Sequence, residues 1–349
     1  MRSWNLSTCK LSHYVEYKQM KTKAILGCTL TVAILALSGS ALAEVKIALV
    51  AKSLGNGFFE AANVGAQEAA KELGDVKVIY TGPTTTTAEA QIEVLNGLIA
   101  QGVDAIAISA NDPDAVVPVL KKAMQRGIKV VSWDSGVAKE GRQIHLNPSN
   151  NALIGETNVK LAADALKALN VEKGDVAILS ATPTSTNQNT WIAEMKKVLP
   201  KYPSVNLVTV AYGDDLSDKS YREAVGLLKS YPNLKVIVSP SSVGIVAAAQ
   251  AVKDQGKIGQ VYVTGLGLPS EMAGAVKSGA SKSFAIWNPI DLGYAATYLA
   301  DDLVKGSATK TEASMGKLGK VKLDADGSGA MAEPFVYDAS NIDKFSKIF

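Results

Sequence analysis

Short apolar runs alternate with helical patterns along nearly the whole chain after residue 43. In the first half, four such runs each lead into a polar cluster, and a helical pattern follows each of the first three. The runs are Lys46–Ala51, Val76–Tyr80, Ala105–Ile108 and Lys129–Ser132. Strands that alternate with helices form a parallel sheet with helices on both faces. Because the carboxyl ends of parallel strands share one edge, these polar clusters are expected to converge on a single site.

The second half of the chain repeats this pattern, starting with a strand at Val176–Leu179. Further strands are expected at Val205–Val210, Val236–Val238, Val261–Val263 and Ser283–Ile286. Two successive β/α series predict an α/β protein with two doubly wound parallel-sheet lobes. Ligands commonly bind between two such lobes, and lobes of this kind can close by a hinge motion.

Residues 1–43 are expected to be an export leader that does not belong to the fold. Two lysines precede an apolar stretch from Ala24 to Leu37, and small residues ending at Ala43 follow it. This is the order of a secretory signal peptide, and the apolar run is shorter than the roughly 18–20 residues of a membrane span. We therefore expect cleavage after Ala43 and a periplasmic location, with Met20 as the natural start of the leader.

The composition of the expected mature chain limits its chemistry and its partners. Both cysteines, Cys9 and Cys28, fall in the leader, so no disulfide or thiol chemistry is expected. The leader also carries five of the 36 basic residues and one of the 33 acidic residues, which leaves a net charge near −1. A nearly neutral protein offers no electrostatic reason to expect a nucleic-acid partner.

The motifs of common cofactor and metal sites are incomplete in this sequence. Gly55-Asn-Gly57 begins like a dinucleotide-binding loop, but Glu60 stands where the third glycine would fall. His145 is the only histidine after the leader, which leaves little for a metal site or a catalytic triad. Asp324–Gly327 resembles the start of a calcium loop without its spacing. We therefore predict no cofactor, no metal and no enzymatic activity, and expect a site that holds a polyhydroxylated ligand.

Several polar and aromatic residues at the strand ends are candidates for that site. Asp134 is the most informative acid, because a carboxylate can accept charge-assisted hydrogen bonds from two neighbouring hydroxyls; its alternative role is in a turn. Asp112 either binds the ligand or caps the helix that follows it. Trp133 and Trp287 lie either in the cleft or in the core, and Asn288 continues the aromatic-plus-polar pattern.

Two other segments contribute candidates with different chemistry. Phe58 and Phe59 follow the first strand, and we expect one ring in the cleft and one in the core. Asn187 and Gln188 lie at the start of a helix, where their amides can donate and accept hydrogen bonds at once. Capping of this helix would account for the presence of one of the two amide residues but not of both.

The leader and the paired lobes occur together with three sequence segments: Gly57–Phe59, Ser109–Asp114 and Trp133–Ser135. This combination resembles the periplasmic sugar-binding proteins of the ribose-binding type, which serve ABC importers. The resemblance implies a type I periplasmic binding fold whose lobes are joined by a three-crossover hinge. Residues 44–147 and 289–319 would form the N-terminal lobe, and residues 148–288 and 320–349 the C-terminal lobe. The resemblance also implies a monomer that delivers a sugar to an inner-membrane permease. A chemoreceptor is a further candidate partner.

Within this family the chain looks closest to the branch that contains rhamnose-binding proteins and the autoinducer-2-binding protein. Lys52, Asp134, Gln188 and Pro240 match the autoinducer-2 pattern. The chain departs from that pattern in two places, with Asn187 in place of aspartate and Ser242 in place of alanine. An amide binds different hydroxyls from a carboxylate, so these departures favour rhamnose over autoinducer-2. The alternatives to rhamnose are autoinducer-2 and another pentose or deoxyhexose.

The expected site combines polar groups for the sugar hydroxyls with an aromatic wall for its methyl group and C–H face. The expected ligand-binding residues are Lys52, Phe58, Phe59, Asp112, Trp133, Asp134, Asn187, Gln188, Pro240, Ser242, Trp287 and Asn288. A sugar-responsive repressor shares the paired lobes but requires an N-terminal helix-turn-helix, where this chain has the apolar leader. A sugar-modifying enzyme would require turnover of the sugar.

Overall fold

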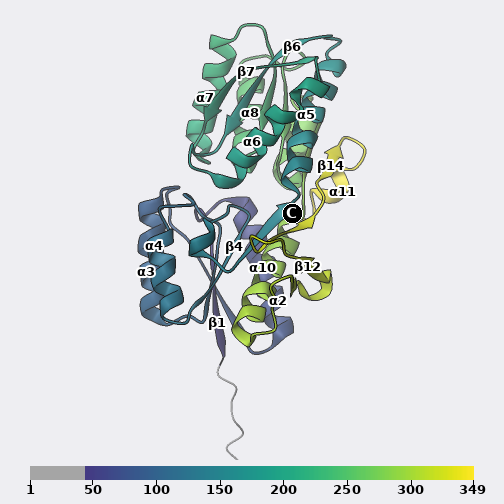
Figure 1. Cartoon of the computed structure of the whole chain (residues 1–349). Helices are drawn as coiled ribbons and strands as arrows, with labels where there is room; N and C mark the ends of the chain where they lie inside the picture. Colours follow the sequence, from purple (N-terminus) through teal and green to yellow (C-terminus); the bar gives the residue numbers. More distant parts are fainter. Residues whose placement is uncertain (1–43) are drawn as a thin grey trace, which may run out of the picture. The chain divides into compact units, whose positions relative to one another are not determined.

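The computed structural model describes residues 44–349. These residues form two parallel sheets, each covered by helices on both faces (Figure 1). The expected leader, its cleavage site after Ala43 and its start at Met20 lie outside the described residues. Within the part that is described, no helix has both the length and the apolar character needed to cross a bilayer.

The first sheet has six strands in the order β13-β5-β4-β3-β1-β2, and neighbouring strands are parallel. Their bounds are β1 Val45–Val50, β2 Val76–Thr81, β3 Ala105–Ile108, β4 Lys129–Trp133, β5 Ile144–Ser149 and β13 Ser328–Ala332. Its helices are α2 Gly57–Leu73, α3 Ala88–Gln101, α4 Val117–Gln125 and α10 Pro289–Lys305. Figure 1 shows α3 and α4 on one face of this sheet and α2 and α10 on the other.

Alternate residues of the central strands explain why both faces are covered. Along β1, Ile47 and Leu49 belong to the same apolar cluster as the α2 residues, whereas Ala48 and Val50 pack with residues of α3 and α4. A strand that is buried on both faces reads as a continuous apolar run. This burial agrees with the parallel sheet that was expected from the alternation of strands and helices along the chain.

The second sheet has four parallel strands in the order β7-β6-β8-β9. Their bounds are β6 Gly174–Ser180, β7 Val205–Tyr212, β8 Leu234–Ser239 and β9 Tyr262–Gly265. Its helices are α5 Asn151–Ala168, α6 Thr186–Val198, α7 Ser217–Ser230, α8 Ser242–Asp254 and α9 Pro269–Ser278. Beyond β9, strand β10 (Ser283–Ile286) pairs antiparallel with β14 (Phe335–Asp338), which the short helix α11 (Ile342–Phe345) follows.

The chain passes between the two sheets three times. It leaves the first sheet after β5 and returns to it after β10 through α10, which packs against α2. It crosses again between β13 and β14. Two doubly wound α/β lobes with three crossovers are the expected fold class, which is therefore confirmed.

The C-terminal tail differs from the expected division of the chain. We expected residues 320–349 to lie with the second lobe, but β13 pairs with β5 in the first sheet, with Ser328 opposite His145. The short ribbon of β11 (Glu312–Ser314) and β12 (Lys320–Lys322) precedes it. Only β14 and α11 lie with the second sheet. The physical reason is that β5 would otherwise be an open edge strand, and β13 satisfies its backbone groups.

Candidate ligand-binding cavity

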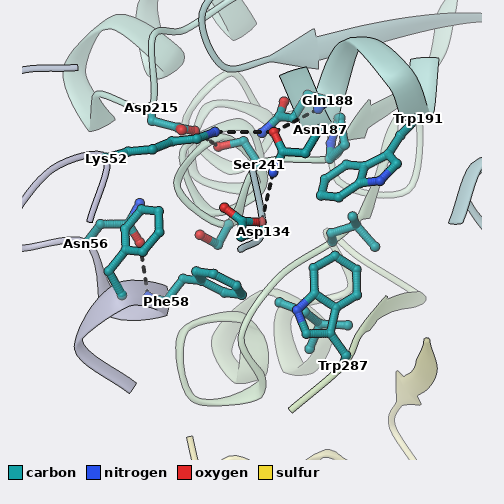
Figure 2. A pocket seen from close by; sticks show the side chains of 15 residues that line it. Lys52, Asn56, Phe58, Asp134, Asn187, Gln188, Trp191, Asp215, Ser241 and Trp287 are labelled. Atoms are coloured by element: carbon teal, nitrogen blue, oxygen red, sulfur yellow. Dashed lines mark hydrogen bonds between the residues drawn. The ribbon is translucent and has the colours of Figure 1, made fainter. Parts of the chain in front are cut away.

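A cavity lies where the carboxyl ends of the strands of both lobes meet (Figure 2). About 370 Å³ of space lies between its lining atoms, counting space that is open to solvent. The lining residues are Lys52, Asn56, Phe58, Phe59, Asp134, Asn187, Gln188, Trp191, Asp215, Pro240, Ser241, Ser242, Leu266, Ile286 and Trp287. Of the four clusters in the first half, those after β1 and β4 line the cavity, whereas those after β2 and β3 contribute no lining residue.

Asp134 follows β4 directly and is almost completely buried. Its backbone is left-handed, with φ at +55°, a conformation that a short polar side chain tolerates better than most. Its Oδ2 accepts a hydrogen bond from Ser109 Oγ at 2.8 Å, and its Oδ1 accepts one from Asn187 Nδ2 at 2.8 Å. A carboxylate oxygen can accept two hydrogen bonds, so each oxygen keeps one acceptor position for a ligand.

The electrostatics at Asp134 are set by burial and by one nearby cation. Burial is the main influence and raises the pKa of the Asp134 carboxyl, while the Lys52 ammonium and the bonds from Ser109 and Asn187 act in the opposite direction. Lys52 is itself buried at the end of β1. An opposite charge in the same pocket is the usual way to hold a buried carboxylate ionised.

Lys52 also joins the two lobes directly. Its Nζ donates to Ser185 Oγ at 2.6 Å and to Asn187 Oδ1 at 3.3 Å, the second of which is drawn in Figure 2. Both partners lie at the N-terminal end of α6. An ammonium has three N–H donors, so one remains for a ligand oxygen.

Asn187 holds this polar network together because its amide donates on one side and accepts on the other. Its Oδ1 accepts from Lys52 and from the backbone N–H of Gln188, while its Nδ2 donates to Asp134. An aspartate at this position could not donate to Asp134 when ionised. The amide is therefore matched to the lysine and the carboxylate on either side of it.

The side chain of Gln188 has a fixed direction as well. Its Oε1 accepts from Ser180 Oγ and from the backbone N–H of Ala181, both at 2.8 Å. Since the carbonyl oxygen is held by the second lobe, the amide nitrogen is the group left for a ligand in the cavity that Gln188 lines.

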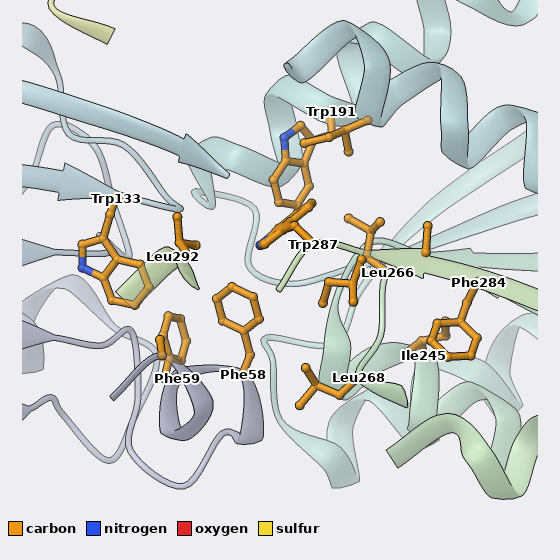
Figure 3. Packing of buried hydrophobic residues seen from close by; sticks show 14 of the residues in the cluster. Phe58, Phe59, Trp133, Trp191, Ile245, Leu266, Leu268, Phe284, Trp287 and Leu292 are labelled. Atoms are coloured by element: carbon orange, nitrogen blue, oxygen red, sulfur yellow. The ribbon is translucent and has the colours of Figure 1, made fainter. Parts of the chain in front are cut away.

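An aromatic wall faces these polar groups (Figure 2), and Figure 3 shows its rings among the buried hydrophobic side chains. Phe58 meets Trp287 edge to face with ring centroids 6.3 Å apart, and Trp287 meets Trp191 at 5.5 Å. Phe59 also lines the cavity while its ring packs against Trp133, so both phenylalanines contribute to the lining. The Nε1 of Trp191 donates to Asn151, whereas the buried Nε1 of Trp287 has no partner within residues 44–349.

Three of the expected site residues do not line this cavity. Asp112 accepts hydrogen bonds from the backbone N–H groups of Asp114 and Ala115, both at 2.9 Å. Asn288 caps α10 by accepting from Ile290, and its amide donates to Asp291. Trp133 has no exposed surface and belongs to the core. Asn288 is thus a helix cap. Asp112 instead holds the loop before α4, whose N-cap is Val116 without a side-chain hydrogen bond.

Six lining residues were not among the expected ones: Asn56, Trp191, Asp215, Ser241, Leu266 and Ile286. A signal for two of them exists in the sequence. Trp191 lies one helical turn after Asn187, which places both on the same face of α6. Asp215 follows β7, as Asp134 follows β4. The strand-end rule applied to the second half would have included it.

A metal centre has no support in the described part of the chain. No group of three or more potential ligands is found among residues 44–349. His145 lies on β5, where its ring nitrogens contact Ser132 and Asn147. Burial, aided by the nearby charge of Arg142, lowers the pKa of its imidazole to about 4.

Comparison with known proteins assigns the family. Residues 47–308 match the model of the periplasmic binding protein domain. The chain belongs to this family. The expected resemblance to sugar-binding proteins of the ribose type is thereby confirmed, and members of this family are binding proteins of transport systems rather than enzymes.

Individual relatives add detail about the ligands of similar proteins. A D-ribose/D-allose-binding protein of Pseudomonas aeruginosa is 31% identical over 226 residues, which cover 63% of this chain and 70% of the relative. A solved ABC transporter solute-binding protein from Clostridium phytofermentas, with L-rhamnose bound, is 37% identical at a TM-score of 0.80, with 87% and 99% of the two chains covered. LsrB from Clostridium saccharobutylicum, in complex with AI-2, is 25% identical at a TM-score of 0.82, with 86% and 99% covered. This periplasmic binding protein is thus a sugar-binding protein of the kind that serves ABC importers.

Proposed function

We propose that this protein is the periplasmic receptor of an ABC importer and that L-rhamnose is its preferred ligand, held in the cavity between the lobes and delivered to the membrane permease. The observation that carries the proposal is the network of Lys52, Asp134 and Asn187 opposite an aromatic wall. A fixed ammonium, carboxylate and amide suit sugar hydroxyls, which both donate and accept hydrogen bonds.

The aromatic side of the cavity favours a deoxy sugar. Phe58, Trp191 and Trp287 present apolar rings, and a 6-deoxy sugar has a methyl group and a C–H face that bury favourably against them. The similar solute-binding protein with L-rhamnose bound supports this choice among sugars.

The alternative ligand is AI-2, because LsrB is similar in fold over nearly its whole length. Two positions of this chain argue against it. Asn187 donates to Asp134, a role that the aspartate of the autoinducer-2 pattern cannot fill when ionised. Ser242 adds a hydroxyl to the lining where that pattern has alanine. Both differences change the hydrogen bonds that the site offers.

The sharpest test is a thermal-shift and titration panel on the purified mature protein. A ligand at one hundred times its dissociation constant stabilises the folded state by about 2.7 kcal/mol, so the preferred sugar should give the largest shift. We expect L-rhamnose to exceed D-ribose, D-allose, D-xylose and AI-2. A larger shift with AI-2 or with ribose would replace rhamnose by that ligand, and no shift with any sugar would overturn the proposal.

A further inference from the structure

The loop after β7 carries a second carboxylate to the cavity. Asp214 and Asp215 follow this strand, and both have a left-handed backbone, with φ at +57° and +54°. Two successive non-glycine residues in this region are unusual, because the Cβ atom crowds the backbone there. Asp215 lines the cavity (Figure 2), whereas Asp214 forms an ion pair with Lys219 at 2.5 Å and is not among the lining residues.

One oxygen of Asp215 is held in place by the second lobe. Its Oδ1 accepts a hydrogen bond from Ser241 Oγ at 2.6 Å. Ser241 is in turn the N-cap of α8, where its Oγ accepts from the backbone N–H of Gly244 at 2.9 Å. The carboxylate is thus oriented by a helix end, and its Oδ2 accepts no hydrogen bond from the rest of the described chain.

The charges around the cavity restrict the class of ligand. Lys52 brings one amino group to the cavity, while Asp134 and Asp215 bring one carboxyl group each. The negative charge of Asp215 is one of the influences that raise the pKa of Asp134, which agrees with the two carboxylates facing the same space. A neutral ligand with hydroxyl donors for both carboxylates satisfies this arrangement. An anionic sugar would meet only Lys52, two of whose donors are already occupied.

We propose that Asp215 is a specificity-determining residue that accepts a hydrogen bond from one sugar hydroxyl, at a position other than the one bound by Asp134. This assignment rests on the proposed function, because it concerns the same cavity. It implies that the ligand is a neutral sugar with free hydroxyls at separate ring positions. Asp134 is supplied by the first lobe and Asp215 by the second, so a sugar held by both links the two lobes.

The test is a double-mutant cycle between the protein and the ligand, measured by isothermal titration. L-Rhamnose and its four monodeoxy analogues, one for each hydroxyl of the pyranose including the anomeric one, are titrated into the wild type and into Asp215→Asn, which keeps the size of the side chain. We expect Asp215→Asn to bind rhamnose at least tenfold more weakly. One deoxy analogue should bind the wild type at least tenfold more weakly than rhamnose, yet bind Asp215→Asn as well as rhamnose does. Such coupling isolates a direct contact.

Two further variants distinguish a direct contact between Asp215 and the sugar from a structural role of Asp215 at the start of α8. Asp214→Asn is the matched control, because this neighbour shares the backbone conformation and lies outside the lining; it should bind rhamnose within twofold of the wild type. Ser241→Ala keeps the Asp215 carboxylate and removes its anchor, so it should lose less affinity and retain the coupling.

The outcomes distinguish this assignment from the proposed function. Unchanged rhamnose affinity in Asp215→Asn would overturn the assignment alone. Equal losses in Asp215→Asn and Ser241→Ala without coupling to any hydroxyl would do the same, and would leave Asp215 as a support for α8. If the wild type binds no sugar, the proposed function fails and the assignment fails with it.

Discussion

Asp134 is the residue on which sugar binding is expected to depend most. It is buried, it already accepts one hydrogen bond on each oxygen, and it lies opposite the aromatic wall. Hydrogen bonds to charged groups contribute roughly 1.5–3 kcal/mol each. Removing two of them from the bound sugar corresponds to a loss of about a hundredfold or more in affinity.

We therefore expect Asp134→Ala to bind rhamnose about a hundredfold or more weakly in isothermal titration. Asp114→Ala is the control, since Asp114 is an exposed aspartate of the same lobe that does not line the cavity. Near-normal affinity in Asp134→Ala, with an intact circular dichroism spectrum, would remove Asp134 from the site and leave it as a turn residue.

Asn187 offers a test of the choice between rhamnose and AI-2. Asn187→Asp replaces the N–H donor to Asp134 by a second carboxylate at hydrogen-bond distance, where two negative charges repel. We expect weaker rhamnose binding at neutral pH and partial recovery on acidification, because a protonated carboxyl can donate again. Tight AI-2 binding is not expected, because Ser242 still differs. Titration of both ligands at two pH values checks this, and a gain in rhamnose affinity at neutral pH would contradict it.

His145 links folding stability to pH. Its pKa is about 4 in the folded protein, against an ordinary value near 6.5. Between these values the unfolded chain binds a proton that the folded chain does not, so stability falls as pH decreases from about 6.5 to 4. The full effect is about 3 kcal/mol, at roughly 1.4 kcal/mol for each pH unit. In urea denaturation, the free energy of unfolding of His145→Gln should change with pH by less than that of the wild type, and the difference should equal this amount. If the two proteins show the same pH dependence, groups other than His145 cause it.

At the scale of elements, the chain returns to the first sheet after β10 because α10 packs against α2. The two helices approach so closely that a Cβ atom on Gly293 would lie 1.9 Å from the carbonyl oxygen of Ala62, and one on Gly65 would lie 1.7 Å from that of Ile290. Backbone atoms cannot move aside as the end of a flexible side chain can. The glycines are therefore required by helix contact and not by backbone conformation.

We expect Gly293→Ala to destabilise the fold by roughly 1–3 kcal/mol or more, the usual range for overpacking. Gly97→Ala is the matched control within α3, since a Cβ there meets nothing within 4 Å; it should be neutral or stabilise by up to about 1 kcal/mol. Urea denaturation of both variants measures the difference. Equal stabilities would show that α10 can shift away from α2 without loss.

At the scale of the whole molecule, the polar contacts across the cleft indicate how closure is stabilised. Beyond the Lys52 and Asp134 bonds, three threonine hydroxyls donate to backbone carbonyls of the opposite lobe at 2.8–3.0 Å: Thr86 to Asp214, Thr184 to Asn111 and Thr186 to Gly136. A ligand shifts an equilibrium between open and closed forms only through contacts that differ between them. Sugar bound to both lobes adds such contacts to those that the protein already has.

Small-angle scattering should therefore show contraction of the protein when rhamnose is added. Thr186→Val removes one closing hydrogen bond, worth roughly 0.5–1.5 kcal/mol, so contraction should require several-fold more sugar. Thr190→Val is the control on the same helix, because the Thr190 hydroxyl bonds within α6 to Thr186. An unchanged radius of the wild type at saturation would count against closure by bridging.

Much of the fold and part of the site could be predicted from local sequence patterns. The alternation of strands and helices along the chain indicated parallel sheets with helices on both faces. The structure accordingly buries both faces of the central strands. Strand ends indicated Lys52 and Asp134, because parallel strands deliver their carboxyl ends to one edge. A helix start indicated Asn187 and Gln188. These predictions depend on neighbours within a few residues, which the sequence displays directly.

Only the tertiary structure decided the features that depend on residues far apart in the chain. Asp112 and Asp134 have the same chemistry after neighbouring strands, but local backbone donors occupy Asp112 while Asp134 faces Asn187 of the other lobe. Likewise β13 lies with the first sheet because the edge of β5 is free to pair with it. The strand-end rule could have placed Asp215 near the site, but the hydrogen bond that holds its Oδ1 comes from Ser241, 26 residues later. Such outcomes depend on which hydrogen-bonding groups remain unsatisfied once the chain has packed, a property that no local pattern contains.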